Sequence, residues 1–116
     1  MMPVIESYSF GRMIIAGSTY TRDVIIFPDG SILSPWWRKE GHVLIRSDLV
    51  DLLAAKPQVI VCGTGAMGVM RPAAELQHYL AAHHIDFIAQ KSSRAVETYN
   101  RMTGRNGLGA CFHLTC

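Results

Sequence analysis

The sequence is poor in charge, has few cysteines and contains no long apolar run. Only 17% of its 116 residues are charged, and eleven lysines and arginines against nine acids give a formal net charge of +2. A nucleic-acid-binding domain normally carries a dominant basic stripe, so a charge this balanced argues against a nucleic-acid partner. No stretch approaches the roughly 18 consecutive apolar residues that cross a bilayer, and we therefore expect no membrane partner.

Cysteine is too scarce for a disulfide framework. Cys62, Cys111 and Cys116 are odd in number and scattered, whereas a secreted domain of this size more often carries an even, disulfide-forming set. The N-terminal residues show neither a basic leader nor an apolar signal core. These observations predict a cytoplasmic protein with free thiols.

Apolar residues make up 49% of the chain, which is enough for a hydrophobic core. At this length one core is expected, so we predict a single domain over residues 1–116. Apolar runs at 12–16, 23–27 and 31–33 predict strands in the first half. Pro28, Asp29 and Gly30 join the last two and favour a hairpin turn, and strands that follow one another this closely must pair antiparallel.

The second half alternates helices and strands. Helical spacing of apolar residues predicts helices over 48–56, 72–83 and 92–102, with Ser47, Pro72 and either Ser92 or Ser93 at their starts. Apolar runs at 59–62, 86–90 and 109–115 predict strands. The predicted fold class is therefore α/β: a three-layer domain with a central mixed sheet, helices and an additional antiparallel hairpin or meander.

A glycine-rich segment follows the predicted strand at 59–62. Gly63, Gly65 and Gly68 match the G-x-G-x-x-G pattern of dinucleotide sites, but Pro72 places the helix start after the third glycine and no acid ends the next strand. A second interpretation is that the N–H groups of Gly65–Gly68 hold a small carboxylate or phosphate, with Arg71 supplying charge. Thr64 is a further candidate ligand-binding residue of the segment 63–68, which we call the glycine loop. A third interpretation is that the glycines only form a tight strand-to-helix connection.

Positive charge is concentrated between residues 91 and 105. This segment contains one acid, Glu97, and four basic residues: Lys91, Arg94, Arg101 and Arg105. Lys91 and Arg94 straddle the start of the third predicted helix, so they are candidate ligand-binding residues at the same sheet edge as the glycine loop. The alternative is a solvated helix face with a Glu97–Arg101 pair.

Two consecutive tryptophans, Trp36 and Trp37, are interface candidates. On an extended chain neighbouring side chains point to opposite faces. One indole can then enter the core, while the other lines an interface, where tryptophan is enriched.

No histidine or cysteine set has the spacing of a metal site. His78, His83 and His84 lack the i,i+4 spacing of a helical pair, and His113 and Cys116 have no second pair to complete a zinc site. Nothing in the sequence brings a serine, a histidine and an aspartate together. The catalytic residues are therefore unknown, and neither a metal nor a cofactor is predicted.

An ordered set of segments resembles a known family of small α/β domains of unknown activity. The segments are residues 5–11 with 13–17, the hairpin 24–33, Trp37 through His42, the strand and loop 59–65, Tyr99 with Asn100, and the strand after Arg105. That family includes the vertebrate adipogenesis-associated protein and a mitochondrial complex I assembly factor, and its founding structure came from a methanogenic archaeon. The resemblance implies a three-layer α/β fold with a central mixed sheet and extra strands, and it brings no catalytic residues.

Two functions from different classes follow. The first is a non-catalytic protein-interaction or assembly module with an unidentified protein partner, which uses Trp36 or Trp37; self-association is also compatible with it. The alternative is a binding protein or enzyme for a small anionic ligand, built on the glycine loop with Arg71 and Lys91. An apolar patch outside any cleft favours the first, and a concave pocket lined by basic side chains favours the second.

Overall fold

A computed structural model describes residues 2–116 of the chain. Its strands are β1 (Ile5–Ser9), β2 (Arg12–Ile15), β3 (Ser18–Tyr20), β4 (Val24–Ile26), β5 (Ile32–Leu33), β6 (Val43–Leu44), β7 (Val59–Thr64), β8 (Arg71–Pro72), β9 (Asp86–Gln90) and β10 (Leu108–His113). Its helices are the 3-10 helix η1 (Arg46–Leu49) and the α-helices α1 (Val50–Ala54), α2 (Ala74–Ala82) and α3 (Ser92–Arg101).

The central sheet has five strands in the order β5-β4-β10-β7-β9. Strands β10, β7 and β9 run parallel, while β4 pairs antiparallel with β10 and with β5. Every residue of β7 and β10 is buried, which agrees with their continuous apolar runs. The β4–β5 pairing, with Ile26 opposite Ile32, confirms the predicted hairpin. The strand that comes last in the sequence thus lies in the middle of the sheet.

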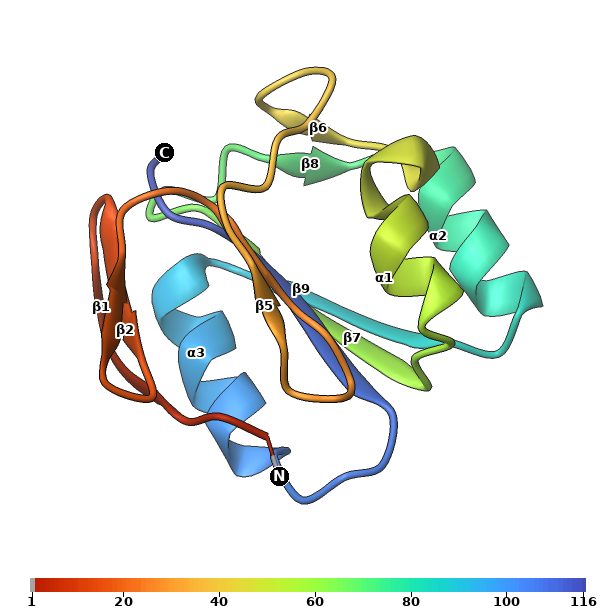
Figure 1. Cartoon of the computed structure of the whole chain (residues 1–116). Coiled ribbons are helices and arrows are strands. Elements are labelled where there is room, and N and C mark those ends of the chain that lie inside the picture. Colours follow the sequence, from red (N-terminus) through yellow and green to blue (C-terminus); the bar gives the residue numbers. More distant parts are fainter. Residues whose placement is uncertain (1) are drawn as a thin grey trace.

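Two hydrophobic cores cover the two faces of this sheet. Side chains of β1, β2 and α3 pack on one face, where Ile15 of β2 and Tyr99 of α3 meet Phe112 of β10 in the first core. Helices η1, α1 and α2 cover the other face, where Leu52, Leu76 and neighbouring residues form the second core. Figure 1 shows α3 with the β1–β2 hairpin on one side of the sheet and α1 with α2 on the other. The predicted α/β fold with a central mixed sheet is confirmed.

Strands β1, β2 and β3 form a separate antiparallel meander. The predicted additional antiparallel meander is present, but of the three strands predicted for it only the one at 12–16 belongs to it, and the other two are β4 and β5 of the central sheet. Two residues of α3 attach the meander to the domain. The Tyr99 hydroxyl donates to the Pro3 carbonyl at 2.7 Å, and the Asn100 amide group both donates to and accepts from the Ile5 backbone. Asn100 therefore contacts β1 through the hydrogen bonds that a neighbouring strand would make.

The predicted helix over 48–56 is shorter than expected and begins with a 3-10 turn. Ser47 lies inside η1 and does not cap a helix, and α1 ends at Ala54. The Asp48 carboxylate accepts from the backbone N–H groups of Lys39 and Ile45, both at 3.0 Å. Asp48 therefore holds the preceding loop in place.

The predicted helix over 72–83 begins two residues late, at Ala74. Pro72 belongs to β8, which pairs with β6 in a two-stranded parallel sheet that the sequence did not indicate. The N–H groups of Arg71 and Ala73 donate to the carbonyls of His42 and Leu44. These pairings keep the chain extended through Pro72, so the helix cannot begin there.

Candidate functional site

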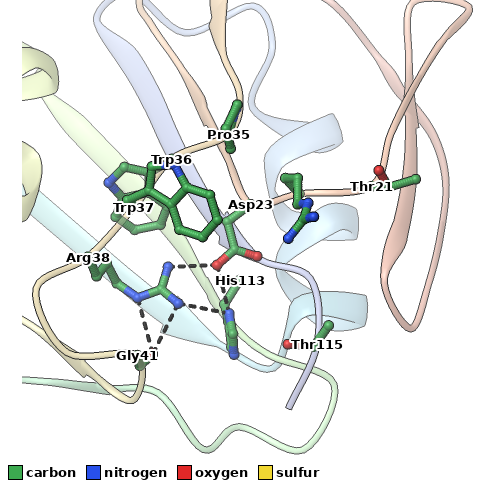
Figure 2. A pocket seen from close by; sticks show the side chains of 10 residues that line it. Thr21, Asp23, Pro35, Trp36, Trp37, Arg38, Gly41, His113 and Thr115 are labelled. Atoms are coloured by element: carbon green, nitrogen blue, oxygen red, sulfur yellow. Dashed lines mark hydrogen bonds and ion pairs between the residues drawn. The ribbon is translucent and has the colours of Figure 1, made fainter.

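Three charged or polar side chains meet at the edge of the sheet where β4 begins and β10 ends. Asp23 precedes β4, Arg38 lies in the segment between β5 and β6, and His113 is the last residue of β10. Asp23 Oδ2 lies 2.7 Å from Arg38 Nη1 and 2.8 Å from His113 Nδ1. The second carboxylate oxygen accepts from the Leu114 N–H at 2.7 Å. Figure 2 shows the three side chains converging.

The carboxylate of Asp23 is held in its charged form. Burial opposes the charge, but the hydrogen bonds from His113, from the Leu114 N–H and from Arg38 outweigh that effect and lower the pKa of Asp23 below its ordinary value. Because a carboxylate can only accept, the short contact to His113 places a proton on Nδ1. Arg38 Nη2 also lies 3.0 Å from this nitrogen and donates to the Gly41 carbonyl, but the negative charge of Asp23 favours the tautomer with the proton on Nδ1. The remaining ring nitrogen, Nε2, is then a hydrogen-bond acceptor when the ring is neutral.

Arg38 connects this cluster to the loop that carries the tryptophans. Its Nη2 and Nε donate to the Gly41 carbonyl at 3.0 and 3.2 Å, and its guanidinium lies 4.8 Å from the Trp36 ring centroid. The Trp36 Nε1–H donates to the Asp48 carbonyl at 2.9 Å. Together with the Asp48 carboxylate, these contacts give the segment from Trp36 to Gly41 a defined conformation.

A cavity of about 250 Å³ opens beside the cluster. Its walls are formed by Thr21, Arg22, Asp23, Pro35, Trp36, Trp37, Arg38, Gly41, His113 and Thr115 (Figure 2). His113 is 6% exposed, and its Nε2 is buried without a hydrogen-bond partner among residues 2–116. Since buried polar atoms are nearly always paired, the unpaired Nε2 is an exception among the described side chains.

The glycine loop does not line this cavity. Within the part of the chain that the structure describes, each N–H group from Gly65 to Val69 donates to the protein itself. Gly65 donates to Ser92 Oγ, Ala66 to the Thr115 carbonyl, and both Met67 and Val69 to the Cys116 carbonyl. A methyl group on Gly65 would overlap the Cys116 carbonyl. The loop therefore holds the C-terminal segment against the sheet.

The predicted basic partners of the loop are dispersed. Lys91 packs over Gly68, where an added Cβ would meet its side chain at 3.3 Å, and Thr64 donates to the Gln90 carbonyl. Arg71 lies on β8 and Arg94 on α3, both exposed. For the described residues, no hydrogen bond or ion pair joins the side chains of Arg71, Lys91 and Arg94 to the loop. The observed N-cap of α3 is Lys91.

Neither Ser92 nor Ser93 caps α3 as predicted. The Ser92 hydroxyl donates to the His113 carbonyl at 2.6 Å and accepts from the Gly65 N–H. It thus joins the start of α3 to the ends of β7 and β10. A methyl group on Gly63 would lie 2.8 Å from this hydroxyl, so Gly63 allows the close approach of α3.

The two tryptophans separate as predicted for an extended pair. Trp36 is 4% exposed and belongs to the second core, whereas Trp37 is 70% exposed. Among residues 2–116, four of the seven exposed large apolar side chains belong to segments that contact the C-terminal segment or share a cavity wall with it: Phe10, Trp37, Met67 and Val69. Gly11, next to Phe10, donates to the Leu114 carbonyl, and Trp37 shares the cavity wall with Thr115. We call these four side chains the apolar rim.

The cysteines take two different positions. Cys62 and Cys111 lie opposite each other on β7 and β10, buried and unbonded, while Cys116 is exposed. The neighbouring Cys62 and burial raise the pKa of the Cys111 thiol well above its ordinary value, so it stays protonated. No group of three histidine, cysteine or acidic side chains in residues 2–116 has the geometry to hold a metal ion.

Sequence reasoning did not select Asp23, Arg22 and Arg38, and it considered His113 only as a metal ligand. One signal was present: His113 is the only side chain in the apolar run 109–115 that can carry a positive charge. A polar residue in such a strand must be paired when buried. Its partner, 90 residues away in the chain, belongs to no local motif.

Comparison with known proteins gives a family and a fold. Residues 5–113 match the family described as "Protein of unknown function (DUF498/DUF598)". The solved structure of MT938 is similar, with 25% identity and a TM-score of 0.80 over 98% of this chain and 99% of that chain. The conserved hypothetical protein PH1505 from Pyrococcus horikoshii OT3 has 24% identity and a TM-score of 0.83, covering 97% and 98%.

A third structure carries the name of the fold. A protein from Bordetella pertussis, described as a Mth938-like domain, has 16% identity and a TM-score of 0.68 over 97% of this chain and 85% of that chain.

None of the helices in the described residues has the length and apolar character to cross a membrane.

Proposed function

Because this chain belongs to the DUF498/DUF598 family of proteins of unknown function, which agrees with the resemblance of its sequence to a family of small α/β domains of unknown activity, we propose its function from its own surface. It is a protein-interaction or assembly module that docks a partner on the apolar rim. The observation that carries this proposal is the exposure of Trp37 on a loop whose neighbouring residues are fixed.

Trp37 has the properties of an interface anchor. Tryptophan and arginine are enriched among the residues that dominate binding energy, and the Arg22 guanidinium lies 5.8 Å from the Trp37 ring centroid. The adjacent Trp36 and Arg38 are buried and hydrogen-bonded. Little conformational freedom of the loop is then lost on binding, which favours affinity.

The charges near the rim indicate the chemistry of the partner. Arg22, Lys39, Arg71 and Lys91 are exposed and make no ion pair among the described residues. Glu40 is exposed beside Lys39, and Asp23 is neutralised by Arg38. A partner segment that combines an aromatic or aliphatic side chain with an acidic residue complements this surface. The proposed partner is therefore an acidic, partly apolar peptide segment.

The test is selection of binding peptides from a display library of random peptides on the immobilised protein. We expect recovered sequences that pair an acidic residue with an apolar one. A representative peptide, measured by titration calorimetry, should bind Trp37→Ala about tenfold or more weakly, because a buried interface tryptophan is typically worth more than about 1.4 kcal/mol.

Val50→Ala is the matched control, since Val50 is also an exposed apolar side chain but lies on α1 and does not belong to the apolar rim. Peptides should bind this variant as they bind the wild type. Peptides that bind Trp37→Ala at full strength, or a selection with no common sequence, would overturn the proposal.

A ligand function at the glycine loop has less support. The N–H groups that would hold an anion there are engaged by Ser92, Thr115, Cys116 and residues of the loop itself. A cytoplasmic location and self-association stay predictions.

A further inference from the structure

We propose that the outer edge of β9 binds an acidic, extended peptide segment of a partner protein, which adds a strand to the central sheet. This inference goes beyond the proposed docking function, because the β9 edge shares no residue with the apolar rim. Three observations carry it: unpaired backbone groups, a basic flank on the α3 side and a groove on the α2 side.

The backbone of β9 is paired on one side. β9 ends the strand order β5-β4-β10-β7-β9, so in the part of the chain that the structure describes no strand covers its other side. The Asp86 N–H donates to the carbonyl of Gln58, just before β7, and successive residues of a strand direct their backbone groups to opposite edges. The N–H and C=O groups of Phe87 and Ala89 therefore point away from β7, where another peptide chain can pair with them.

The β9 edge lacks the features that usually protect the edge of a sheet, which are shortness, proline, bulges and free charges. The opposite edge strand, β5, has two residues. β9 has five residues in unbroken register with β7 and contains no proline. Its one charged side chain, Asp86, is paired with Arg105. Ala89 is exposed, and Phe87 and Ile88 are partly buried, so the edge is open to a partner.

The α3 side of the edge is basic. The Thr98 hydroxyl donates to Gln90 Oε1 at 2.6 Å, so this face of α3 lies against β9. Arg94 precedes Thr98 by four residues and Arg101 follows it by three, which places both on the same face of the helix. Both arginines are exposed and make no ion pair within residues 2–116. α3 contains one acid, Glu97.

The charge of this flank selects the kind of partner. Carboxylates on an added strand would meet the guanidinium groups of Arg94 and Arg101, which match carboxylate geometry. A second copy of the chain, paired through the same edge, would instead bring the α3 arginines of the two copies together. The free backbone groups of β9 are complementary to a peptide. We therefore infer an acidic peptide segment of another protein.

The α2 side of the edge contains a groove of about 460 Å³. Its lining residues belong to α2, to β9 and to the turn between them, and four of them are apolar: Leu80, Ala81, Ile85 and Phe87. Phe87 packs against the core under α2, whereas Ile88 packs against the core under α3 (Figure 1). Side chains of an added strand would alternate in the same way. The best partner therefore alternates apolar side chains toward the groove with carboxylates toward the arginines.

The experiment titrates the protein with short synthetic peptides at constant ionic strength. The probe is a capped hexapeptide of alternating glutamate and valine. One control peptide has the same composition, with the glutamates in one block and the valines in another, and a second alternates lysine and valine. The readouts are the ¹H–¹⁵N shifts and the hydrogen-exchange rates of the backbone amides.

We expect the alternating acidic peptide to shift the amide signals of β9 and to slow the exchange of the Phe87 and Ala89 amides. The block peptide should bind more weakly, and the lysine peptide should not bind. Arg94→Ala and Arg101→Ala should each weaken binding about threefold, as the loss of an exposed ion pair does. Arg12→Ala, which removes an exposed arginine of β2, should leave the affinity unchanged.

Ala89→Pro tests the backbone contact. It removes an N–H that points away from β7, and proline is accepted at the edge of a sheet, so this variant should keep its fold and lose peptide binding. The exchange rates of the wild type give the same information if the variant does not fold.

The inference would be overturned by the absence of binding, by equal affinity for the acidic and the lysine peptides, or by unchanged exchange of Phe87 and Ala89 at saturation. Binding that is lost in Trp37→Ala but kept in Arg94→Ala would place the peptide on the apolar rim. That result would also overturn the inference, while the proposed docking function would stand.

Discussion

The glycine loop and the Asp23–His113 cavity lie at the same edge of the sheet but differ in what their polar groups contact. The loop has a recognisable motif, yet the N–H groups from Gly65 to Val69 donate to the protein itself. The cavity has no motif, yet it leaves His113 Nε2 unpaired and Arg22 without an acid among the described residues. The comparison teaches that a glycine motif does not by itself leave N–H groups free for a ligand.

The largest effect should come from filling the space at Gly65. Its φ of +106° is accessible to glycine, and a methyl group there would overlap the Cys116 carbonyl. We expect Gly65→Ala to lower the free energy of unfolding by about 3 kcal/mol or more, measured by urea denaturation.

Gly17→Ala is the control for that substitution, because Gly17 also has a positive φ, +83°, but has open space around it. It should cost about 1 kcal/mol for the backbone strain alone. Equal losses in the two variants would mean that the loop does not hold the C-terminal segment tightly.

A smaller effect is expected at the cavity from Arg38→Met, which removes the partner of a largely buried carboxylate. The Asp23 side chain is 14% exposed, and breaking such a pair should cost about 2–3 kcal/mol in urea denaturation. Arg105→Ala breaks the exposed pair with Asp86 and should cost less than about 1 kcal/mol. Similar losses of stability in Arg38→Met and Arg105→Ala would show that Asp23 and Arg38 do not form a buried ion pair.

The stability of the protein should also depend on the charge of Asp23. The pKa of Asp23 is lower in the folded than in the unfolded protein, so between the two values the unfolded state binds more protons and stability rises with pH. The contribution is complete above the ordinary pKa of about 4 and is lost as the pH falls through the folded value.

Wild-type protein should therefore lose more stability between about pH 5 and about pH 3 than Asp23→Asn, which has no proton to take up at this position. Urea denaturation at a series of pH values measures the difference. Parallel curves for the two proteins would contradict the assignment of a charged Asp23.

The smallest effect is expected from Arg71→Ala. Arg71 is exposed, and its side chain makes no hydrogen bond within residues 2–116, so the free energy of unfolding should change by less than about 0.5 kcal/mol. A larger loss of unfolding free energy would show that Arg71 supports the glycine loop. The contrast between the glycine loop and the Asp23–His113 cavity would then weaken.

Much of the fold could be predicted because it is encoded locally. Continuous apolar runs identified β7 and β10, and the turn residues 28–30 identified the β4–β5 hairpin. The β6–β8 sheet could not be predicted, since its two-residue strands depend on pairing between distant segments. The same pairing delays α2 past Pro72.

The candidate site was predictable only in part. The division of Trp36 and Trp37 between core and surface follows from the alternation of side chains on an extended chain. The Asp23–Arg38–His113 cluster joins three segments separated by 15 and 75 residues. Its side chains come together only because β4 and β10 are neighbours in the sheet, and no local pattern reports that pairing.

The position of β10 in the middle of the sheet has a consequence for synthesis on the ribosome. Strand β4 and strand β7 both pair with β10 and not with each other. Until residues 108–113 have been translated, neither β4 nor β7 has the neighbour that it pairs with at the centre of the sheet. Because ribosomes add only about 5–20 residues per second, this pairing waits for seconds, and the central sheet can be completed only at the end of synthesis.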